Sequence, residues 1–283
     1  MRKGILVNVV VFALLFCAGY SQSVIAAEFP EAPSSVAVAD QRTTESGPSD
    51  RDGGNASKAA ESHSDQFLGY WLKRGLHDQA SIYTAPFHES ALKWDIALPA
   101  ITLGLIAIDK HASGALSRSG TGVSNDISNV GLFTSAGTVG LLLLDGELRS
   151  DSHARETGIL GGESMANSGL LYIALQLITE RDRPLQDAGE GHFFQTSGLN
   201  NSFPSGHAIL TWSAASAIAH EYPKPWIQWL TYGTAAAVSV TRFTSLQHFP
   251  SDVVVGSTLG SLVGRHVFHR HCDASLSPAC KTK

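Results

Sequence analysis

The sequence predicts an all-α protein built around a bundle of six helices. Six apolar stretches with helical spacing follow Trp94, and patterns typical of strands are scarce. The composition agrees with this prediction, since 16% of the residues are charged, 43% are hydrophobic and 27 are glycine. An ordinary soluble domain has about 25% charged residues. The expected helices cover residues 94–110, 127–146, 157–180, 206–221, 225–243 and 252–270.

The N-terminal 27 residues have the three parts of a secretory signal peptide. Arg2 and Lys3 supply the positive start, residues 4–19 form the apolar core, and small residues around 24–27 offer a cleavage site. An uncleaved anchor helix is the alternative. Residues 28–65 are rich in Ser, Ala, Gly and acidic side chains without apolar periodicity, which predicts a disordered leader.

The helical domain is expected to run from residue 66 to residue 272, and residues 273–283 form a C-terminal tail. The domain begins near Phe67, in a stretch whose apolar residues share one helical face. Cys272 and Cys280 lie close together near the end of the chain. In an oxidising compartment such a pair closes a small loop, and two free thiols are the alternative.

The six expected helices are marginal as membrane spans. A span needs about 20 mostly apolar residues, whereas one apolar run stops at Asp109 and Lys110 and the last ends at Arg265. We therefore expect an exported, periplasmic bundle that is soluble or peripherally attached to a membrane; an integral inner-membrane protein is the alternative. The net charge of −5, without a run of Lys and Arg, argues against a nucleic-acid partner.

Three short polar motifs stand at the ends of the expected helices. The third helix ends where the fourth begins, and the fifth ends where the sixth begins. In an antiparallel bundle these ends can meet on one face. The motifs are Arg181-Asp182-Arg183-Pro184, then Pro204-Ser205-Gly206-His207, and finally Arg242-x5-His248-x3-Asp252.

The residue types in these motifs suit a tetrahedral oxyanion. Arg183 and Arg242 carry planar guanidinium groups that bind two oxygens each. A helix that starts after Ser205 adds backbone N–H groups and a favourable dipole. Taken singly, Arg183 could cap a helix C-terminus, Ser205 an N-terminus, and Asp252 could be an N-terminal acid. The coincidence of three motifs favours a functional site.

In order and spacing, the motifs resemble the signature of the type 2 phosphatidic acid phosphatase and vanadium-dependent haloperoxidase superfamily: Lys-x6-Arg-Pro, Pro-Ser-Gly-His and Ser-Arg-x5-His-x3-Asp. The resemblance covers residues 176–252. It implies that His248 is a nucleophile that forms a phosphohistidine, and that Asp252 orients its ring. It also implies that His207 protonates the leaving oxygen and then activates water. The phosphate contacts implied are Arg183, Ser205, Gly206 and Arg242.

Two positions depart from the signature. Gln176 stands where the family has lysine, so a donor is kept but a positive charge is lost. Either Arg181, two residues before Arg183, compensates for this charge, or the site binds phosphate less tightly. We include Gln176 and Arg181 among the expected phosphate-binding residues. Thr241 replaces the serine before the third-motif arginine and retains a hydroxyl.

The resemblance implies an exported phosphatase that needs no metal or cofactor, because arginines supply the positive charge. Its expected substrate is a phosphorylated small molecule or a lipid (pyro)phosphate, with membrane association left open. A vanadium-dependent haloperoxidase, holding vanadate in the same pocket, is the alternative, and the missing lysine counts against it. A membrane-associated binding protein with weak catalysis is a third hypothesis.

Overall fold

The computed structural model describes residues 73–85, 92–195 and 198–282. No strand occurs among these residues, and the prediction of an all-α bundle is confirmed. The expected signal peptide, the leader and the start of the domain near Phe67 lie outside the described residues. The six long helices are α3 (Leu92–Gly114), α4 (Thr121–Arg149), α5 (Ser152–Thr179), α6 (Gly206–Glu221), α7 (Pro225–Thr244) and α8 (Pro250–His271).

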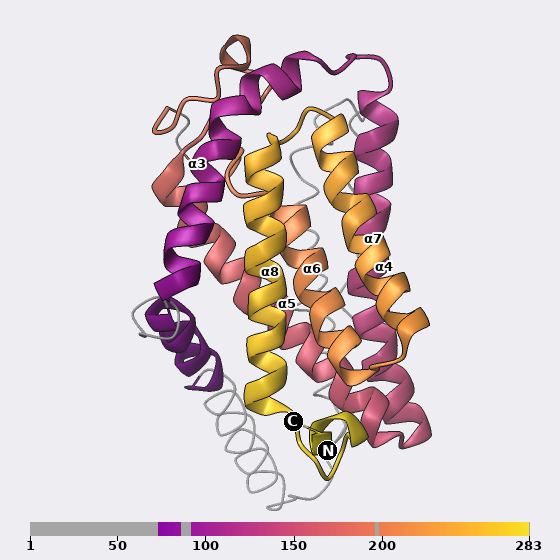
Figure 1. Ribbon diagram of the computed structural model, residues 1–283. Helices are drawn as coiled ribbons and strands as arrows, with labels where there is room; N and C mark the ends of the chain where they lie inside the picture. Colours follow the sequence, from indigo (N-terminus) through magenta and orange to yellow (C-terminus); the bar gives the residue numbers. More distant parts are fainter. Residues whose placement is uncertain (1–72, 86–91, 196–197, 283) are drawn as a thin grey trace, which may run out of the picture.

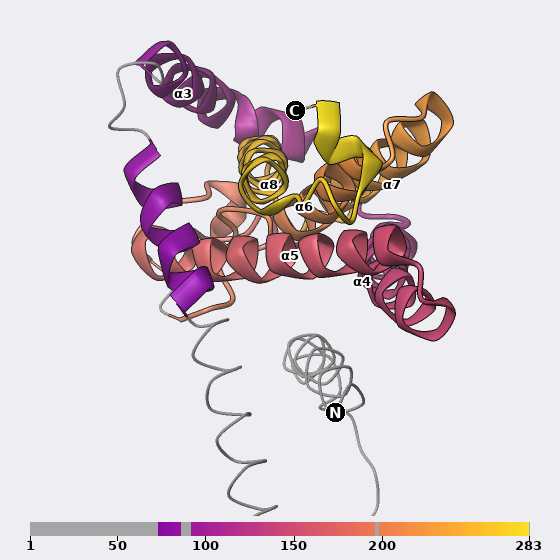
Figure 2. The same ribbon diagram turned by 90° about the horizontal axis from the view of Figure 1, so that it is seen from below.

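Helix α6 occupies the middle of the bundle and packs against α4, α5, α7 and α8 (Figures 1 and 2). Helix α3 lies at the edge, where it contacts α8. The central position of α6 agrees with its composition, since nearly all of its side chains are buried and many of them are Ala or Ser. Small side chains allow helices to approach closely, so this helix can be surrounded on all sides.

Helices α6 and α8 approach each other closely. Gly256, Gly260 and Gly264 form a stripe at every fourth position of α8. A Cβ atom on Gly260 would lie 2.2 Å from the carbonyl oxygen of Ile209, so only glycine fits there. The N-terminal ends of the two helices are joined as well, because the Ser205 N–H donates to the Asp252 carbonyl at 3.0 Å.

The far end of the bundle, away from these N-termini, is closed by the C-terminal tail. Cys272 and Cys280 form a disulfide, which resolves the alternative that the sequence left open. Ser277 in the closed loop donates to the buried carboxylate of Glu221 at the end of α6, with an Oγ–Oε2 distance of 2.5 Å. The tail is therefore tied to the central helix both directly and through α8.

Two helices are apolar over a length that would cross a bilayer: the stretch Ile96–Gly114 of α3 and the whole of α4. Only 11% and 22% of these stretches are buried inside the protein. From the sequence, all six helices are expected to be marginal membrane spans, whereas these two are long and apolar enough to cross a membrane. Core helices of soluble proteins and signal sequences can be equally long and apolar, so these two helices are only weak evidence for a membrane span.

Candidate active site

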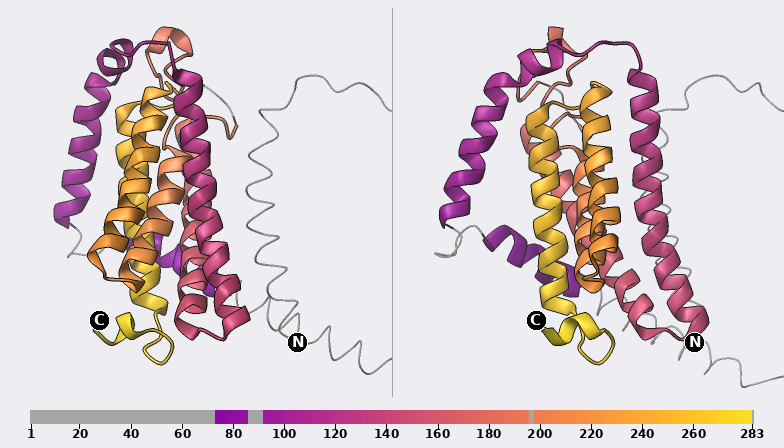
Figure 3. Two further views of the ribbon diagram at one scale, coloured as in Figure 1. Left: turned by 90° about the vertical axis from the view of Figure 1, so that its right-hand side faces the viewer. Right: turned by 45° about the vertical axis from the view of Figure 1, so that its right-hand side comes forward.

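The three sequence motifs lie at one end of the bundle. The connections from α5 to α6 and from α7 to α8 are both at this end, together with the connection from α3 to α4 (Figure 3). Helix polarity produces this arrangement, because α5 and α7 run toward this end and α6 and α8 run away from it. The prediction that the motifs share one face follows from the same polarity.

His248 lies in the connection between α7 and α8 and is buried. Its Nδ1 is 2.6 Å from the Ser202 carbonyl oxygen, and since a carbonyl can only accept, Nδ1 carries the proton. The other ring nitrogen, Nε2, is then unprotonated and accepts a hydrogen bond from Nη2 of Arg242 at 3.3 Å. Burial, together with the charges of Arg242 and Arg183, holds the pKa of His248 well below its usual range.

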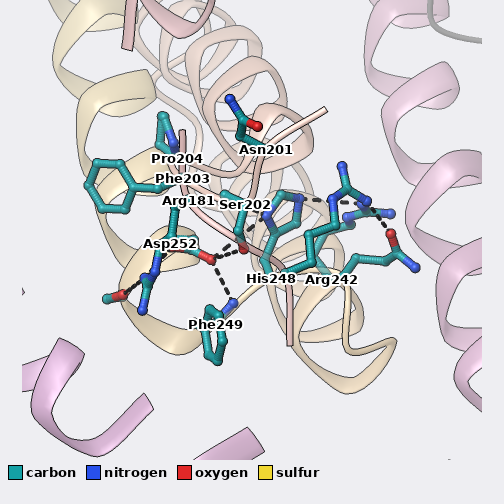
Figure 4. A network of polar contacts seen from close by, with 12 residues as sticks. Arg181, Asn201, Ser202, Phe203, Pro204, Arg242, His248, Phe249 and Asp252 are labelled. Atoms are coloured by element: carbon teal, nitrogen blue, oxygen red, sulfur yellow. Dashed lines mark hydrogen bonds and ion pairs between the residues drawn. The ribbon is translucent and has the colours of Figure 1, made fainter. Parts of the chain in front are cut away.

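Asp252, in the first turn of α8, does not take the ring proton of His248 as the resemblance implies. Its Oδ2 is 3.9 Å from Nδ1, outside hydrogen-bond distance, and accepts instead from the Ser202 hydroxyl at 2.5 Å and from the Phe249 N–H at 2.7 Å. Ser202 therefore stands between the carboxylate and the imidazole (Figure 4). Burial raises the pKa of Asp252 to about 6, against the lowering effect of Arg181.

Arg181 is not brought to the group around His248. Its Nη1 donates to Asp252 at 2.6 Å and its Nη2 to Asp109 of α3 at 2.8 Å, while Nε donates to the Gly191 carbonyl. Figure 4 shows Arg181 and Arg242 on opposite sides of the Asp252 and His248 pair. The expectation that Arg181 binds phosphate is therefore corrected, because its donors are engaged by buried protein acceptors.

Gln176 is fully buried near the C-terminal end of α5 and holds the segment before α6. Its Nε2 lies 3.1 Å from the carbonyl oxygens of Asn201 and Phe203, and its Oε1 accepts from the Asn201 N–H at 2.8 Å. The amide thus braces the loop that delivers Ser205. The expectation that Gln176 contacts phosphate is corrected, because both ends of its amide bind backbone groups.

Replacing Gln176 with lysine, the residue of the family signature, is expected to destabilise the protein. Lysine has no acceptor for the Asn201 N–H, and an unpaired buried donor costs about 1–3 kcal/mol. Chemical or thermal unfolding of Gln176→Lys measures the loss, with the exposed Gln195→Ala as the control. An unchanged free energy of unfolding in Gln176→Lys would show that the loop does not depend on this amide.

His207 lies in the first turn of α6 and contacts α4. Its Nε2 is 2.8 Å from Oδ1 of Asn129. Arg242 reaches the same helix, with Nη1 2.7 Å from Oδ1 of Asn125. Burial, followed by the charges of Arg242 and Arg183, holds the pKa of His207 well below its usual range. His207 and Arg242 thus contact neighbouring turns of α4, and Arg242 also contacts His248, so the three residues form one group.

Arg183 is half-buried and belongs to this group through its charge. Its guanidinium donates to the Gln247 side chain, one residue before His248. Because Arg183 lowers the pKa of both histidines, its positive charge lies near each of them. The structure therefore brings together Arg183, Arg242, His207 and His248, as the motifs predicted.

Ser205 precedes the first residue of α6, Gly206, and its side chain does not cap the helix. The Ser205 hydroxyl is buried and has no hydrogen-bond partner among the described residues. Its backbone N–H donates to the backbone carbonyl of Asp252, so this N–H is not directed at an anion. The first turn that Gly206 opens still presents N–H groups without intrahelical acceptors.

Sequence reasoning did not find Ser202, Asp109 or the polar residues of α4. Ser202 lies three residues before Ser205, and its carbonyl and hydroxyl contact His248 and Asp252 respectively. The signal available for α4 is the spacing of Asn125 and Asn129, which places two amides one turn apart on an otherwise apolar helix. That spacing does not predict which residues the two amides contact.

The site belongs to a class defined by two imidazoles and two guanidiniums beside the N-terminus of a buried helix, a donor set suited to a phosphate-like anion. Comparison with protein families agrees, since residues 159–274 match the PAP2 superfamily. The resemblance inferred from the motifs is confirmed over this part of the chain. Helices α3 and α4 precede the matched residues.

Two curated proteins are similar to part of the chain. The lipid A 1-phosphatase of Porphyromonas gingivalis is 35% identical over 66 residues, which cover 23% of this chain and 15% of that protein. The bacitracin transport permease protein BcrC of Bacillus licheniformis is 40% identical over 70 residues, which cover 25% of this chain and 34% of that protein. The chain thus spans less than two thirds of the length of either relative. No solved structure matches.

Proposed function

We propose that the protein is a phosphatase that hydrolyses a phosphate monoester or a lipid (pyro)phosphate through a phosphohistidine at His248. The observation that carries this proposal is the protonation of the His248 ring and the contacts of its two nitrogens. Its Nδ1 proton is directed to a backbone carbonyl, and its Nε2 lone pair lies beside the Arg242 guanidinium. This arrangement supports the assignment of His248 as the nucleophile, because its unprotonated nitrogen lies beside a guanidinium that suits an anion.

In the first step, Nε2 of His248 attacks phosphorus, and the bond from phosphorus to the leaving oxygen breaks as His207 donates its proton to that oxygen. Arg183 and Arg242 neutralise the charge on the equatorial oxygens. Phosphorylation makes the His248 ring cationic. The Ser202 carbonyl at 2.6 Å and the Asp252 carboxylate at 3.9 Å stabilise that charge.

In the second step, neutral His207 takes a proton from water, the water oxygen attacks phosphorus, and the bond to Nε2 of His248 breaks. Phosphate leaves, and His248 is neutral again. The buried hydroxyl of Ser205 supports anion binding at this place, because a buried hydroxyl without a protein partner is costly unless a ligand satisfies it. The reaction proposed here uses no metal ion or cofactor, since the arginines supply the charge.

A lipid-linked phosphate is the substrate class we favour. The outer faces of α3 and α4 expose large apolar side chains, including Ile101 and Leu103 on α3 and Val130 on α4, which are 55%, 67% and 64% exposed. Contact of these faces with a bilayer would remove that surface from water. The ends of α3 and α4 nearest the site would then lie at headgroup level. One similar protein acts, by its name, on lipid A, and export by the N-terminal signal is part of the proposal.

The pH profile of turnover is expected to be narrow and acidic in the free enzyme. Asp252 must be ionised, and with its pKa raised to about 6, activity is lost as the pH falls through that value. His207 must be protonated, and because its pKa is lowered, activity is also lost as the pH rises, starting below 6.5. A bound phosphate dianion raises the pKa of His207, so the alkaline limb of kcat lies above that of kcat/KM.

Rates measured across the pH range with an alkyl phosphate monoester, whose leaving oxygen must be protonated, give both profiles. A kcat/KM that stays constant to about pH 8 would contradict the assignment of His207 as the acid, since its burial could not then control turnover.

A substrate panel tests the function as a whole. Hydrolysis of p-nitrophenyl phosphate, phosphatidic acid and a polyprenyl pyrophosphate is measured in membrane and soluble fractions. We expect activity in the membrane fraction, with a lipid substrate preferred over p-nitrophenyl phosphate. Bromination that requires added vanadate, peroxide and halide, without hydrolysis, would establish the haloperoxidase alternative. If none of the three substrates is hydrolysed and no bromination occurs, the hypothesis of a binding protein remains.

A further inference from the structure

We infer that Asn129 and Asn125 of α4 are positioning residues of the active site: Asn129 holds the ring of His207 and Asn125 holds the guanidinium of Arg242. This inference rests on the proposed function and adds to it a helix that precedes the family match. Figure 1 shows α4 beside α7 over much of its length, with its N-terminal end at the end of the bundle where α7 finishes. The geometry that follows concerns only this N-terminal end.

The polar side chains of α4 meet the site along one face. Asn125, Ser128 and Asn129 have the spacing of residues on consecutive turns. Arg242 Nη1 donates to Oδ1 of Asn125 at 2.7 Å and to Oγ of Ser128 at 3.3 Å. His207 Nε2 lies 2.8 Å from Oδ1 of Asn129. Three successive positions of one face thus contact two of the groups that the reaction requires.

The opposite face of the same turns is apolar and exposed. Val123, Ile127 and Val130 are 65%, 50% and 64% exposed, whereas Ser128 is completely buried. This is the reverse of an ordinary surface helix, which turns its polar side outward. The amides therefore do not serve to solvate the helix. They are directed inward because Arg242 and His207 are there.

The contact with Asn129 has a consequence for the protonation of His207. An amide oxygen can only accept, so Nε2 of His207 carries a proton. The same bond is stronger to the charged imidazolium than to the neutral ring. Arg242 of α7, Arg183 after α5 and His248 before α8 face this ring, and the two arginines favour its neutral form. Asn129 opposes them and keeps His207 able to act as an acid.

The two amides predict different kinetic effects. Asn129→Ala is expected to lower kcat about 10- to 100-fold with little change in KM, because an acid is used in the transition state. Asn125→Ala is expected mainly to raise KM, since Arg242 contacts phosphate in the bound substrate as well. Asn129→Asp places a carboxylate beside the ring and should move the alkaline limb of kcat/KM upward by about one pH unit or more.

The matched control is Thr134→Ala, an exposed change on the same helix that should alter neither parameter. The loss in Asn129→Ala should disappear in a His207→Ala background, because the amide acts through that ring. An equal loss in both backgrounds would show that Asn129 only supports the fold, and an unshifted alkaline limb in Asn129→Asp would overturn the inference.

A measurement that does not depend on turnover distinguishes a failure of this inference from a failure of the proposed function. The His207 resonance of histidine-labelled protein is titrated by NMR in the parent, in Asn129→Ala and in Asn129→Asp. We expect the pKa of His207 to fall in the alanine variant and to rise in the aspartate variant. If the parent hydrolyses none of the panel while these shifts occur, the proposed function fails and the contact stands. If the shifts are absent, the inference fails whatever the activity.

Discussion

His248→Ala is expected to lose about 10⁴-fold or more of its kcat, the scale seen when a covalent nucleophile is removed. The reason is geometric, because Nδ1 of His248 binds a backbone carbonyl, which leaves Nε2 unprotonated beside the Arg242 guanidinium. Labelled phosphate should be trapped on the parent by a rapid denaturing quench, in a base-stable, acid-labile form. The same experiment on His248→Ala should trap nothing.

Two comparisons sharpen this result. His77→Ala, an exposed histidine on the helical segment 73–84, should behave as the parent does. His207→Ala should still form the phosphoenzyme from p-nitrophenyl phosphate, whose leaving group needs little protonation, but should hydrolyse it slowly, so the trapped label increases. Label that remains covalently bound after His248 is removed would place the nucleophile elsewhere and contradict the mechanism.

Arg181→Ala is expected to lower the free energy of unfolding by about 3–5 kcal/mol, the range found when one partner of a buried ion pair is removed. Arg181 is completely buried and neutralises two buried carboxylates, Asp252 at 2.6 Å and Asp109 at 2.8 Å. Its guanidinium also lies over the rings of Phe193 and Phe249, with distances of 4.7 and 4.3 Å to their centres. Alanine would leave both carboxylates unpaired.

The matched comparison is Arg149→Ala, which removes an exposed arginine whose partner, Asp145, lies one turn away on α4. Exposed pairs of this kind contribute little, so its stability should change by less than about 1 kcal/mol. Denaturant titration of the purified variants measures both values. Equal, small effects at the two arginines would show that the charges of Asp109 and Asp252 are compensated by other groups.

The sequence predicted the helices and the place of the site because both depend on periodicity and spacing. Apolar stretches define α3 to α8, and the motifs fall at helix ends of matching polarity. The direction of individual side chains was harder to predict. Arg181 and Arg183 are two residues apart, yet one faces the buried carboxylates and the other lies near the histidines. Both arginines lie in the loop after α5, which sets the direction of their side chains. The spacing of residues in the sequence does not define the conformation of a loop.

Gln176 illustrates the same limit. The family spacing placed it near the phosphate motif, and its amide does reach the carbonyl of Phe203, two residues before Ser205. Its partners are backbone groups of a loop whose conformation composition does not reveal. Asn129 was missed for a related reason, since an asparagine on an apolar helix signals a buried partner without identifying it. Both roles depend on tertiary contacts.

The glycine stripe of α8 has a consequence for how such a site can vary. With backbone against backbone at Gly260, the separation of α6 from α8 cannot be adjusted by choosing larger or smaller side chains. The distance between these two helices is therefore fixed, and with it the relative position of the imidazoles at their N-terminal ends. Accommodation of a bulkier or smaller molecule therefore has to come from the loops that connect the helices at this end of the bundle.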